Sequence, residues 1–313
     1  MGLAEDVAAG LSAEHKYLPS RYFYDAEGDQ LFQQIMKMPE YYLTGCEYEI
    51  FSTKGGDILR AFSKGGKPFD LLEFGAGDGT KTRILLKRLL ENGADFRYVP
   101  IDISGDVLVN LKNDLSKEFP DLPVRPENAE YFSALDNVQV ESDRPKLVLF
   151  IGSSIGNFKE EVINRFMEEL FSKLNSGDQI LLGYDLMKNP HTIIDAYNDS
   201  TGITKAFNLN VLRRINRELN ADFNIEAFDH YPYYDPETGL AKSYLVSLKN
   251  QTVTIDALST NYKFETGEVI HTEISRKFRV EHIETYFRQA GFEVVEHFYD
   301  CKHYFVDTLV KKP

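Results

Sequence analysis

The chain has 313 residues, a net charge of −14, and 42% hydrophobic and 13% aromatic residues. This length allows one large domain or two smaller ones with a proper core. The acidic balance argues against a nucleic-acid partner and against attraction to anionic membranes. Two distant cysteines, Cys46 and Cys301, indicate a reducing compartment, and the first residues do not resemble a signal peptide. We therefore expect a cytoplasmic protein.

Residues 1–60 are expected to be helical. In the stretch LFQQIMKMPEYY, the apolar residues Leu31, Phe32, Ile35 and Met38 recur on one helical face. Pro39 then breaks this pattern, because proline lacks the backbone N–H that a helix interior needs.

From about residue 68, short apolar runs alternate with longer amphipathic segments. This alternation predicts a parallel sheet with right-handed crossovers and helices on both faces, an α/β fold of the Rossmann-like kind. The expected strands are 69–76, 96–104, 122–129, 146–158 and 178–186, and the expected helices are 80–93, 105–119 and 160–174.

A second texture begins near residue 196. We expect a helix at 207–219, a strand at 244–255 and a hairpin over 262–275 that turns at Thr266–Gly267, together forming an α+β lobe. Residues 280–312 predict a helix and two strands that close the first sheet as an antiparallel hairpin. The predicted domains are 61–195 with 286–313 for a cofactor, and 1–60 with 196–285 for a substrate.

The stretch LLEFGAGDGTKT, residues 71–82, predicts a nucleotide or nucleoside site, because a strand enters a glycine-rich turn before a helix. Gly75, Gly77 and Gly79 do not fit the dinucleotide pattern, whose third glycine position is occupied by Thr80. A P-loop would need a different order from Gly79-Thr80-Lys81. A tight turn without any ligand is the alternative.

The spacing E-x-G-x-G-x-G, which begins at Glu73, resembles motif I of the class I S-adenosylmethionine-dependent methyltransferases. Asp102 ends the second predicted strand, where an acid can accept hydrogen bonds from both ribose hydroxyls. Since NAD sites share this acid, an NAD-dependent oxidoreductase remains an alternative. A non-enzymatic module that binds the cofactor is another.

Five blocks in the same order resemble the histidine Nα-methyltransferases of ergothioneine biosynthesis and cover nearly the whole chain. They read YLPSRYFYDAEGDQLFQQIMKMPEYYLT, FGAGDGTKTR, VLFIGSSIGNF, YNDSTGITKAFNLNVL and HTEISRKF. The resemblance implies S-adenosylmethionine as cofactor and S-adenosylhomocysteine as its product. It also implies a free amino acid as substrate, with trimethylhistidine (hercynine) formed by three transfers.

The resemblance implies that the cofactor is held by the glycine loop, Lys81 and Asp102. Glu130 and Tyr131 stand where the family has an Asp-aromatic pair next to the adenine. On residue type alone, Lys81 could equally be a surface lysine.

The resemblance also implies a set of substrate residues. Asn157 and Tyr197 would hold the carboxylate, and Tyr24 would orient the amine. Tyr41, Glu273 and Ser275 would read the imidazole, although the two tyrosines could simply pack and the Glu-Ser pair could be solvated.

One departure leaves the substrate open, because Ser243 stands where the family has a methionine near the side-chain pocket. Another amino acid or a small amine is therefore the alternative substrate. The seven histidines show no metal-ligand spacing, so we expect no metal. We expect a monomer whose partner is its small-molecule substrate.

Overall fold

The computed structural model describes residues 2–62 and 67–313. The chain divides into two compact units, which are described separately. The first unit comprises Met1–Tyr42 and Met187–Lys277, and the second comprises Leu43–Leu186 and Phe278–Pro313. Cofactor binding by one part of the chain and substrate binding by the other remain predictions.

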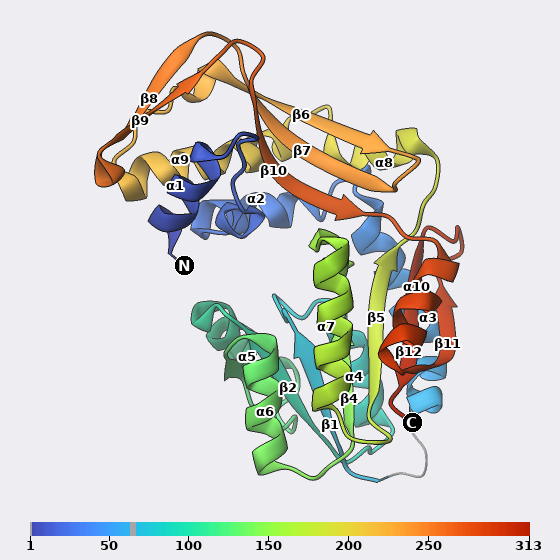
Figure 1. Ribbon diagram of the computed structural model, residues 1–313. Helices are drawn as coiled ribbons and strands as arrows, with labels where there is room; N and C mark the ends of the chain where they lie inside the picture. The colour runs from blue at the N-terminus through green and yellow to red at the C-terminus, as the bar shows by residue number, and fades with distance from the viewer. Residues whose placement is uncertain (1, 63–66) are drawn as a thin grey trace. The chain divides into compact units, whose positions relative to one another are not determined.

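The second unit contains a seven-stranded sheet in the order β11-β12-β5-β4-β1-β2-β3 (Figure 1). Strands β5, β4, β1, β2 and β3 are parallel, and β12 and β11 close the sheet as an antiparallel pair, as predicted. The bounds are β1 Phe69–Phe74, β2 Phe96–Asp102, β3 Glu127–Asn128, β4 Lys146–Phe150, β5 Gln179–Asp185, β11 Glu293–Tyr299 and β12 Phe305–Lys311.

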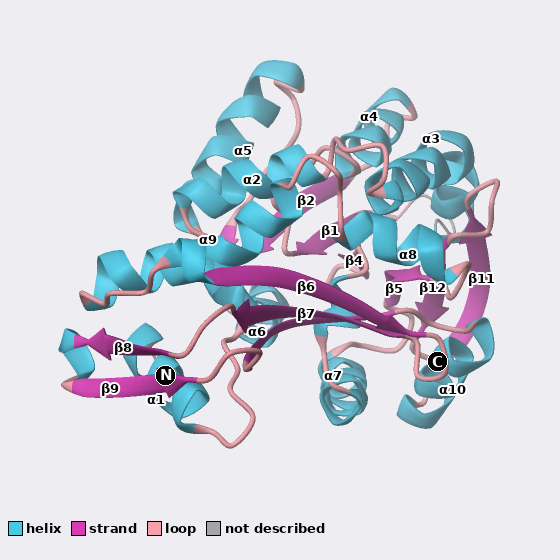
Figure 2. Cartoon of the chain, turned by 90° about the horizontal axis from the view of Figure 1, so that it is seen from above, coloured by secondary structure: helices cyan, strands magenta, loops and turns pink. Residues whose placement is uncertain are grey.

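Helices cover both faces of this sheet, which confirms the predicted α/β class. Apolar residues of α6, α7 and α10 form one core with the strands, while α3 and α4 lie on the other face (Figures 1 and 2). The bounds are α3 Tyr42–Phe62, α4 Thr82–Glu91, α5 Gly105–Glu118, α6 Tyr131–Glu141, α7 Glu160–Lys173 and α10 Val280–Ala290.

The third strand is much shorter than the predicted range 122–129. It comprises only Glu127 and Asn128, with one isolated bridge between Val124 and Tyr98. Pro123 and Pro126 fall inside the predicted range and have no N–H to donate, so a continuous ladder cannot form there.

The first unit combines helices with small antiparallel sheets. Strands β10, β7 and β6 form a three-stranded sheet, β8 and β9 form a separate pair, and α9 lies along β6 (Figure 2). The bounds are α1 Leu3–Ser12, α2 Ala26–Ile35, α8 Pro190–Tyr197, α9 Ile203–Leu219, β6 Phe228–Asp235, β7 Leu240–Ser247, β8 Gln251–Ile255, β9 Thr260–Phe264 and β10 Val269–Arg276.

Two predictions for this unit are wrong. The expected strand 244–255 is two strands, because the exposed residues 248–250 interrupt it. The expected hairpin at Thr266–Gly267 does not form, since β9 pairs with β8 and β10 pairs with β7. Local alternation identified the strands, but their partners lie elsewhere in the sequence.

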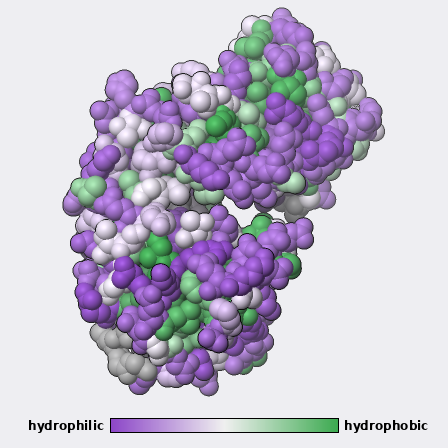
Figure 3. Space-filling model, turned by 180° about the vertical axis from the view of Figure 1, so that it is seen from behind, coloured by the Kyte–Doolittle hydropathy of each residue, from purple (hydrophilic) through white to green (hydrophobic). Residues whose placement is uncertain are grey.

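The surface is mostly hydrophilic on the face drawn in Figure 3, where hydrophobic residues gather in small groups. This agrees with the acidic composition. Within residues 2–62 and 67–313, no helix combines the length and the apolar character that crossing a membrane requires.

Candidate active site

The glycine loop follows β1 and has a backbone that only glycine adopts easily. Gly75, Gly77 and Gly79 have φ angles of 69°, 53° and 66°, all in the left-handed region. A Cβ on Gly79 would meet Leu111 Cδ1 at 2.8 Å, whereas a Cβ on Gly77 would have no atom within 4 Å. Gly77 therefore presents open backbone, which suits the close approach of a ligand.

Glu73 is the second-last residue of β1 and is buried, 2% exposed, just before this loop. Its carboxylate accepts hydrogen bonds from the Thr82 hydroxyl at 2.6 Å and from the Tyr98 hydroxyl. Burial raises the pKa of Glu73 to about 7, and these two hydrogen bonds partly oppose the rise. Glu73 thus ties β1 to β2 and to the start of α4.

Asp102 ends β2 and lies next to the loop. One of its carboxylate oxygens accepts the Ser104 N–H at 2.9 Å, and the other is 3.5 Å from the Gly77 nitrogen. The half-buried position leaves this carboxylate able to accept further hydrogen bonds.

Tyr131 begins α6, and Glu130 precedes it at the exposed end of the helix. The Tyr131 ring stacks on Phe74, the last residue of β1, with 4.8 Å between ring centroids. The ring therefore lies beside the start of the glycine loop, where a Cβ on Gly75 would be 3.3 Å from the Tyr131 hydroxyl. Burial, followed by the charges of Asp102 and Glu130, raises the pKa of its hydroxyl to about 12. The ring therefore stays neutral and offers a flat apolar surface.

Lys81 lies at the start of α4 and is held by Glu47 of α3, a residue that the sequence analysis missed. Glu47 is fully buried; its carboxylate pairs with Lys81 Nζ and accepts the Gly152 N–H at 2.8 and 3.0 Å. Burial acts to lower the pKa of Lys81, but the Glu47 carboxylate outweighs it and the pKa is raised.

Asp307 of β12 is fully buried beside Glu47. Burial, and then the Glu47 charge, raise the pKa of Asp307 well above its usual value, so it keeps its proton. Glu47 could have been noticed in the sequence, because it is an acid on an otherwise apolar face of α3. That face also carries Leu43, Ile50 and Phe51.

These second-unit residues fit a nucleoside that carries an amino-acid tail. The open backbone at Gly77 allows close approach, and Asp102 can accept from ribose hydroxyls. Tyr131 offers a ring face, and the ammonium of Lys81 offers a charge for a carboxylate.

In the first unit, β10 and β7 bring a group of predicted substrate residues together. Glu273 and Ser275 occupy alternate positions of β10 and share one face of the sheet. Ser243 of β7 is 1% exposed and pairs in register with Glu273, so both side chains lie on this face. The residue at the family's methionine position is thus next to Glu273.

Tyr197, the last residue of α8, contacts the same face. Its hydroxyl donates to Ser275 Oγ at 2.9 Å. Lys277, which the sequence analysis did not single out, is 2% exposed and donates to both Tyr197 Oη at 2.7 Å and Ser275 Oγ at 2.8 Å. These three side chains form a buried polar cluster.

Tyr24 and Tyr41 come from the N-terminal segment of the same unit. Both rings pack edge-on against Phe32, at 5.5 and 6.4 Å between centroids, so packing accounts for part of their placement. Burial and then the charge of Glu273 raise the pKa of Tyr24 well above its usual value. Tyr24 still keeps 41% of its surface exposed, so a small molecule can reach it.

Glu273 is half-buried, and burial raises its pKa to about 7, with the Lys277 charge opposing the rise. A carboxylate in such a place binds an N–H donor more strongly than an exposed one would, because little water competes.

Asn157 lies elsewhere in the chain, at the end of the 3₁₀ turn Ser154–Asn157 that follows β4 in the second unit, and is exposed.

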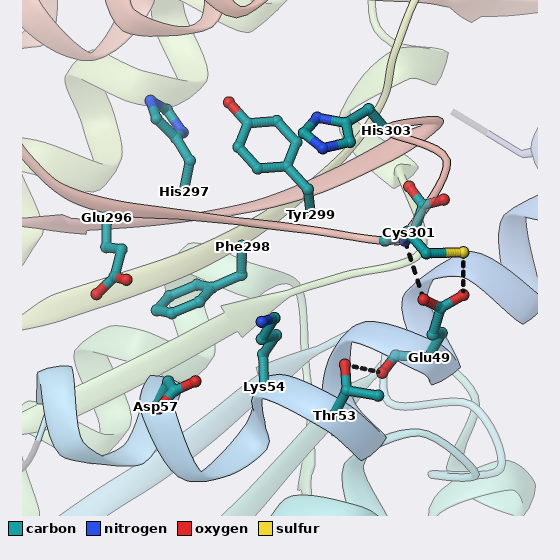
Figure 4. A pocket seen from close by; sticks show the side chains of 11 residues that line it. Glu49, Thr53, Lys54, Asp57, Glu296, His297, Phe298, Tyr299, Cys301 and His303 are labelled. Carbon is teal, nitrogen blue, oxygen red and sulfur yellow. Dashed lines mark hydrogen bonds between the residues drawn. The ribbon is translucent and has the colours of Figure 1, made fainter.

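An open hollow of about 520 Å³ lies between α3 and β11 in the second unit, and none of the predicted site residues lines it (Figure 4). Glu49, Asp300 and Cys301 there have ligand atoms within 4.8 Å of one another. Their hydrogen bonds explain this grouping. Glu49 accepts from the Cys301 N–H and thiol, and Asp300 accepts from three backbone N–H groups, so we assign no metal to them.

Residues 3–312 match the family described as histidine-specific, S-adenosylmethionine-dependent methyltransferases. The chain belongs to this family. The match spans both units, and S-adenosylmethionine as methyl donor agrees with the open glycine loop and the Asp102 carboxylate. Membership of this family excludes the alternative function raised from the sequence, an NAD-dependent oxidoreductase.

Relatives in this methyltransferase family support the same conclusion. The chain is 36% identical to histidine N-alpha-methyltransferase from Mycolicibacterium smegmatis, over 92% of this chain and 88% of that protein. It is 34% identical to the protein of that name from Mycobacterium tuberculosis, over 93% and 89%. It is 26% identical to ergothioneine biosynthesis protein 1 of Schizosaccharomyces pombe, over 89% of this chain and 36% of that protein.

Proposed function

We propose that this methyltransferase transfers methyl groups from S-adenosylmethionine to the α-amino group of free L-histidine, giving trimethylhistidine and S-adenosylhomocysteine. The reaction would serve ergothioneine biosynthesis, in the cytoplasm, with a monomeric enzyme. The observation that carries the substrate proposal is the pair of Glu273 and Ser275, which present a carboxylate and a hydroxyl side by side on one strand face.

The cofactor residues have distinct proposed roles. Gly75, Gly77 and Gly79 let the backbone approach, and Asp102 accepts from the ribose hydroxyls. Tyr131, with Glu130, contacts the adenine. Lys81 offers its ammonium to the carboxylate of the methionyl tail, while Glu73 supports the loop from below.

Substrate binding rests on the side chains of β10, β7 and their neighbours, together with Asn157. Glu273 accepts an imidazole N–H, Ser275 serves the other ring nitrogen, and Tyr41 contacts the ring. Asn157 is the proposed partner of the carboxylate. Tyr197 had the same role in the prediction from the sequence, but its one hydroxyl proton is directed to Ser275, so it supports the side-chain pocket instead. A buried site built for such bonds rejects ligands that leave its polar groups unpaired.

The chemistry requires a neutral amine. When bound, S-adenosylmethionine supplies an electrophilic methyl group on a sulfonium, which is a good leaving group. The protein's main task is positioning, because a held amine reacts far faster than a free one. Tyr24 is the proposed residue that orients the amine. Its raised pKa keeps the phenol protonated, so it acts through its hydroxyl and not as a phenolate base.

A different amino acid or a small amine is the second candidate substrate, and the buried serine at position 243 favours it. A serine leaves more room beside Glu273 than the methionine expected from the resemblance, so a ring larger than imidazole could enter.

The test is to incubate the protein with S-adenosylmethionine labelled in its methyl group and each of the twenty amino acids, and to detect products by mass spectrometry. We expect label on histidine, in mono-, di- and trimethyl forms. Transfer to another amino acid, with none to histidine, would contradict the substrate proposal. No transfer to any of the twenty would leave the enzymatic role itself without support.

A further inference from the structure

We propose that Lys277 is a specificity-positioning residue, which fixes the Ser275 hydroxyl as a hydrogen-bond donor and thereby restricts the side-chain pocket to rings with one N–H and one unprotonated nitrogen. The proposal rests on the substrate roles proposed for Ser275 and Glu273. It adds a residue to which the sequence motif gave no role.

The argument begins with what an ammonium group can do. Lys277 Nζ has protons to donate and no lone pair, so Ser275 Oγ and Tyr197 Oη must both act as acceptors toward it, at 2.8 and 2.7 Å. The burial of all three side chains makes these bonds stronger than exposed ones would be.

The bond between the two hydroxyls gives the next step. Tyr197 donates to Ser275 at 2.9 Å. This direction is chemically favoured, because a phenol is more acidic than an aliphatic hydroxyl and is the better donor. Ser275 Oγ then accepts two hydrogen bonds, one from Lys277 and one from Tyr197, which occupies both of its lone pairs.

Ser275 is left with only its own proton to offer a ligand. Glu273, two residues earlier on the same strand face, offers only acceptor oxygens when it is ionised. The pair therefore presents one donor and one acceptor. A neutral imidazole matches it, with its N–H directed to Glu273 and its unprotonated nitrogen directed to Ser275.

A ring that lacks the second nitrogen does not match this pair. Pyrrolylalanines keep one N–H but have carbon in place of the other nitrogen, so the Ser275 proton would be buried without a partner. Leaving such a group unpaired costs enough to weaken binding roughly tenfold to a hundredfold. Without Lys277, Ser275 can turn its proton toward Tyr197, and this penalty disappears.

The experiment measures the ratio of kcat/KM for histidine to kcat/KM for each pyrrolylalanine isomer. We expect a ratio of roughly ten or more in the wild type. We expect it to fall several-fold in Lys277→Met, which has similar length without donors, and to recover in Lys277→Arg. Lys242→Met is the matched control, because Lys242 lies on the opposite face of β7 and should leave the ratio unchanged.

Tyr197→Phe provides a second test. Alone, it gives the Ser275 proton no new acceptor, so the ratio should stay as high as in the wild type. In Lys277→Met/Tyr197→Phe, Ser275 has lost the oxygen toward which its proton could turn, so the ratio should rise again above that of Lys277→Met. A ratio in the double variant as low as in Lys277→Met would overturn the proposal.

A merely structural role for Lys277 would also overturn the proposal, and it gives a different pattern. Lys277→Met would then lower the melting temperature and raise KM for histidine and the pyrrolylalanines alike. Failure of the proposed function is separately visible, because the wild type would then not methylate histidine at all.

Discussion

The glycine loop after β1 and the side-chain face of β10, which are the proposed cofactor and substrate sites, are built in opposite ways. The loop does so through backbone conformation: three glycines with positive φ lie within five residues of sequence, and Gly77 is left open. The β10 face does so through side chains. It brings residues of β7, α8 and the N-terminal segment to Glu273 and Ser275. The residues of the proposed cofactor site are thus close together in the sequence, and those of the proposed substrate site are not.

The two regions also differ in the partners of a lysine that is half-buried in the loop, Lys81, and buried on the β10 face, Lys277. Lys81 pairs with a carboxylate, Glu47, which is itself fully buried. Lys277 donates to two neutral hydroxyls. Removing Lys81 leaves the fully buried Glu47 carboxylate without its ion-pair partner. Removing Lys277 leaves two hydroxyls that can bond to each other, and it raises the pKa of the half-buried Glu273 further, so that this carboxyl can take up a proton.

The largest expected effect therefore follows loss of the Lys81 ammonium. Lys81→Met should lower the free energy of unfolding by about 3 kcal/mol, because Glu47 would remain buried without its partner. Lys277→Met should cost clearly less. Urea denaturation of both variants measures the difference.

Lys87→Met is the control for this comparison, since Lys87 and Glu91 form an exposed pair. The double variant Glu47→Gln/Lys81→Met should regain part of the lost stability, because it removes the unpaired charge. If Lys81→Met were no more destabilising than Lys87→Met, the ion pair would not distinguish the two regions.

The second prediction concerns pH. Burial raises the pKa of Glu273 to about 7 in the folded protein, from an ordinary value near 4.5. The folded state therefore binds more protons between these values, and stability is lost as pH rises through 7. Glu273→Gln should match the wild type at pH 4.5 and exceed its stability at pH 8 by on the order of 2 kcal/mol.

Melting temperatures at the two pH values test this. Glu73 in the second unit has the same direction of shift and remains in the variant, so part of the pH dependence should persist. Glu265→Gln, at an exposed position, should leave the profile unchanged. An unaltered profile in Glu273→Gln would show that Glu273 is not desolvated by its surroundings.

The third prediction compares two glycines with the same backbone. Gly77 and Gly93 have φ angles of 53° and 65°, and a Cβ on either would meet no atom within 4 Å. Alanine at each should cost a similar free energy of unfolding, about 1 kcal/mol, from the left-handed conformation. Only Gly77→Ala should weaken binding of S-adenosylhomocysteine, roughly tenfold. Equal dissociation constants for the two variants would mean that no ligand approaches the loop at Gly77.

The sequence predicted the second unit better than the first for a physical reason. Buried parallel strands and their crossover helices are marked by continuous apolar runs and by glycine turns, which are local signals. The third strand failed because prolines at 123 and 126 interrupt its ladder. In the first unit the predicted single strand 244–255 is divided into β7 and β8, and β9 pairs with β8 instead of forming the predicted hairpin with β10.

The sequence indicated those candidate site residues that lie in a motif. It did not indicate those whose importance comes from being buried. The glycine loop and the alternate positions of Glu273 and Ser275 follow from sequence spacing. The sequence missed three charged residues, Glu47, Asp307 and Lys277. The local sequence around a charged residue does not show whether it is buried or which residue will be its partner. Such partners come from segments up to hundreds of residues away.

The most direct test is a pair of calorimetric titrations on two variants, Gly77→Ala and Glu273→Gln, with S-adenosylhomocysteine and then with histidine added to the protein saturated with S-adenosylhomocysteine. We predict that Gly77→Ala weakens only S-adenosylhomocysteine binding and that Glu273→Gln weakens only histidine binding, each by roughly tenfold or more. Equal loss of both ligands in either variant, or full histidine affinity in Glu273→Gln, would contradict the assignment of the cofactor to the loop and of the substrate to β10.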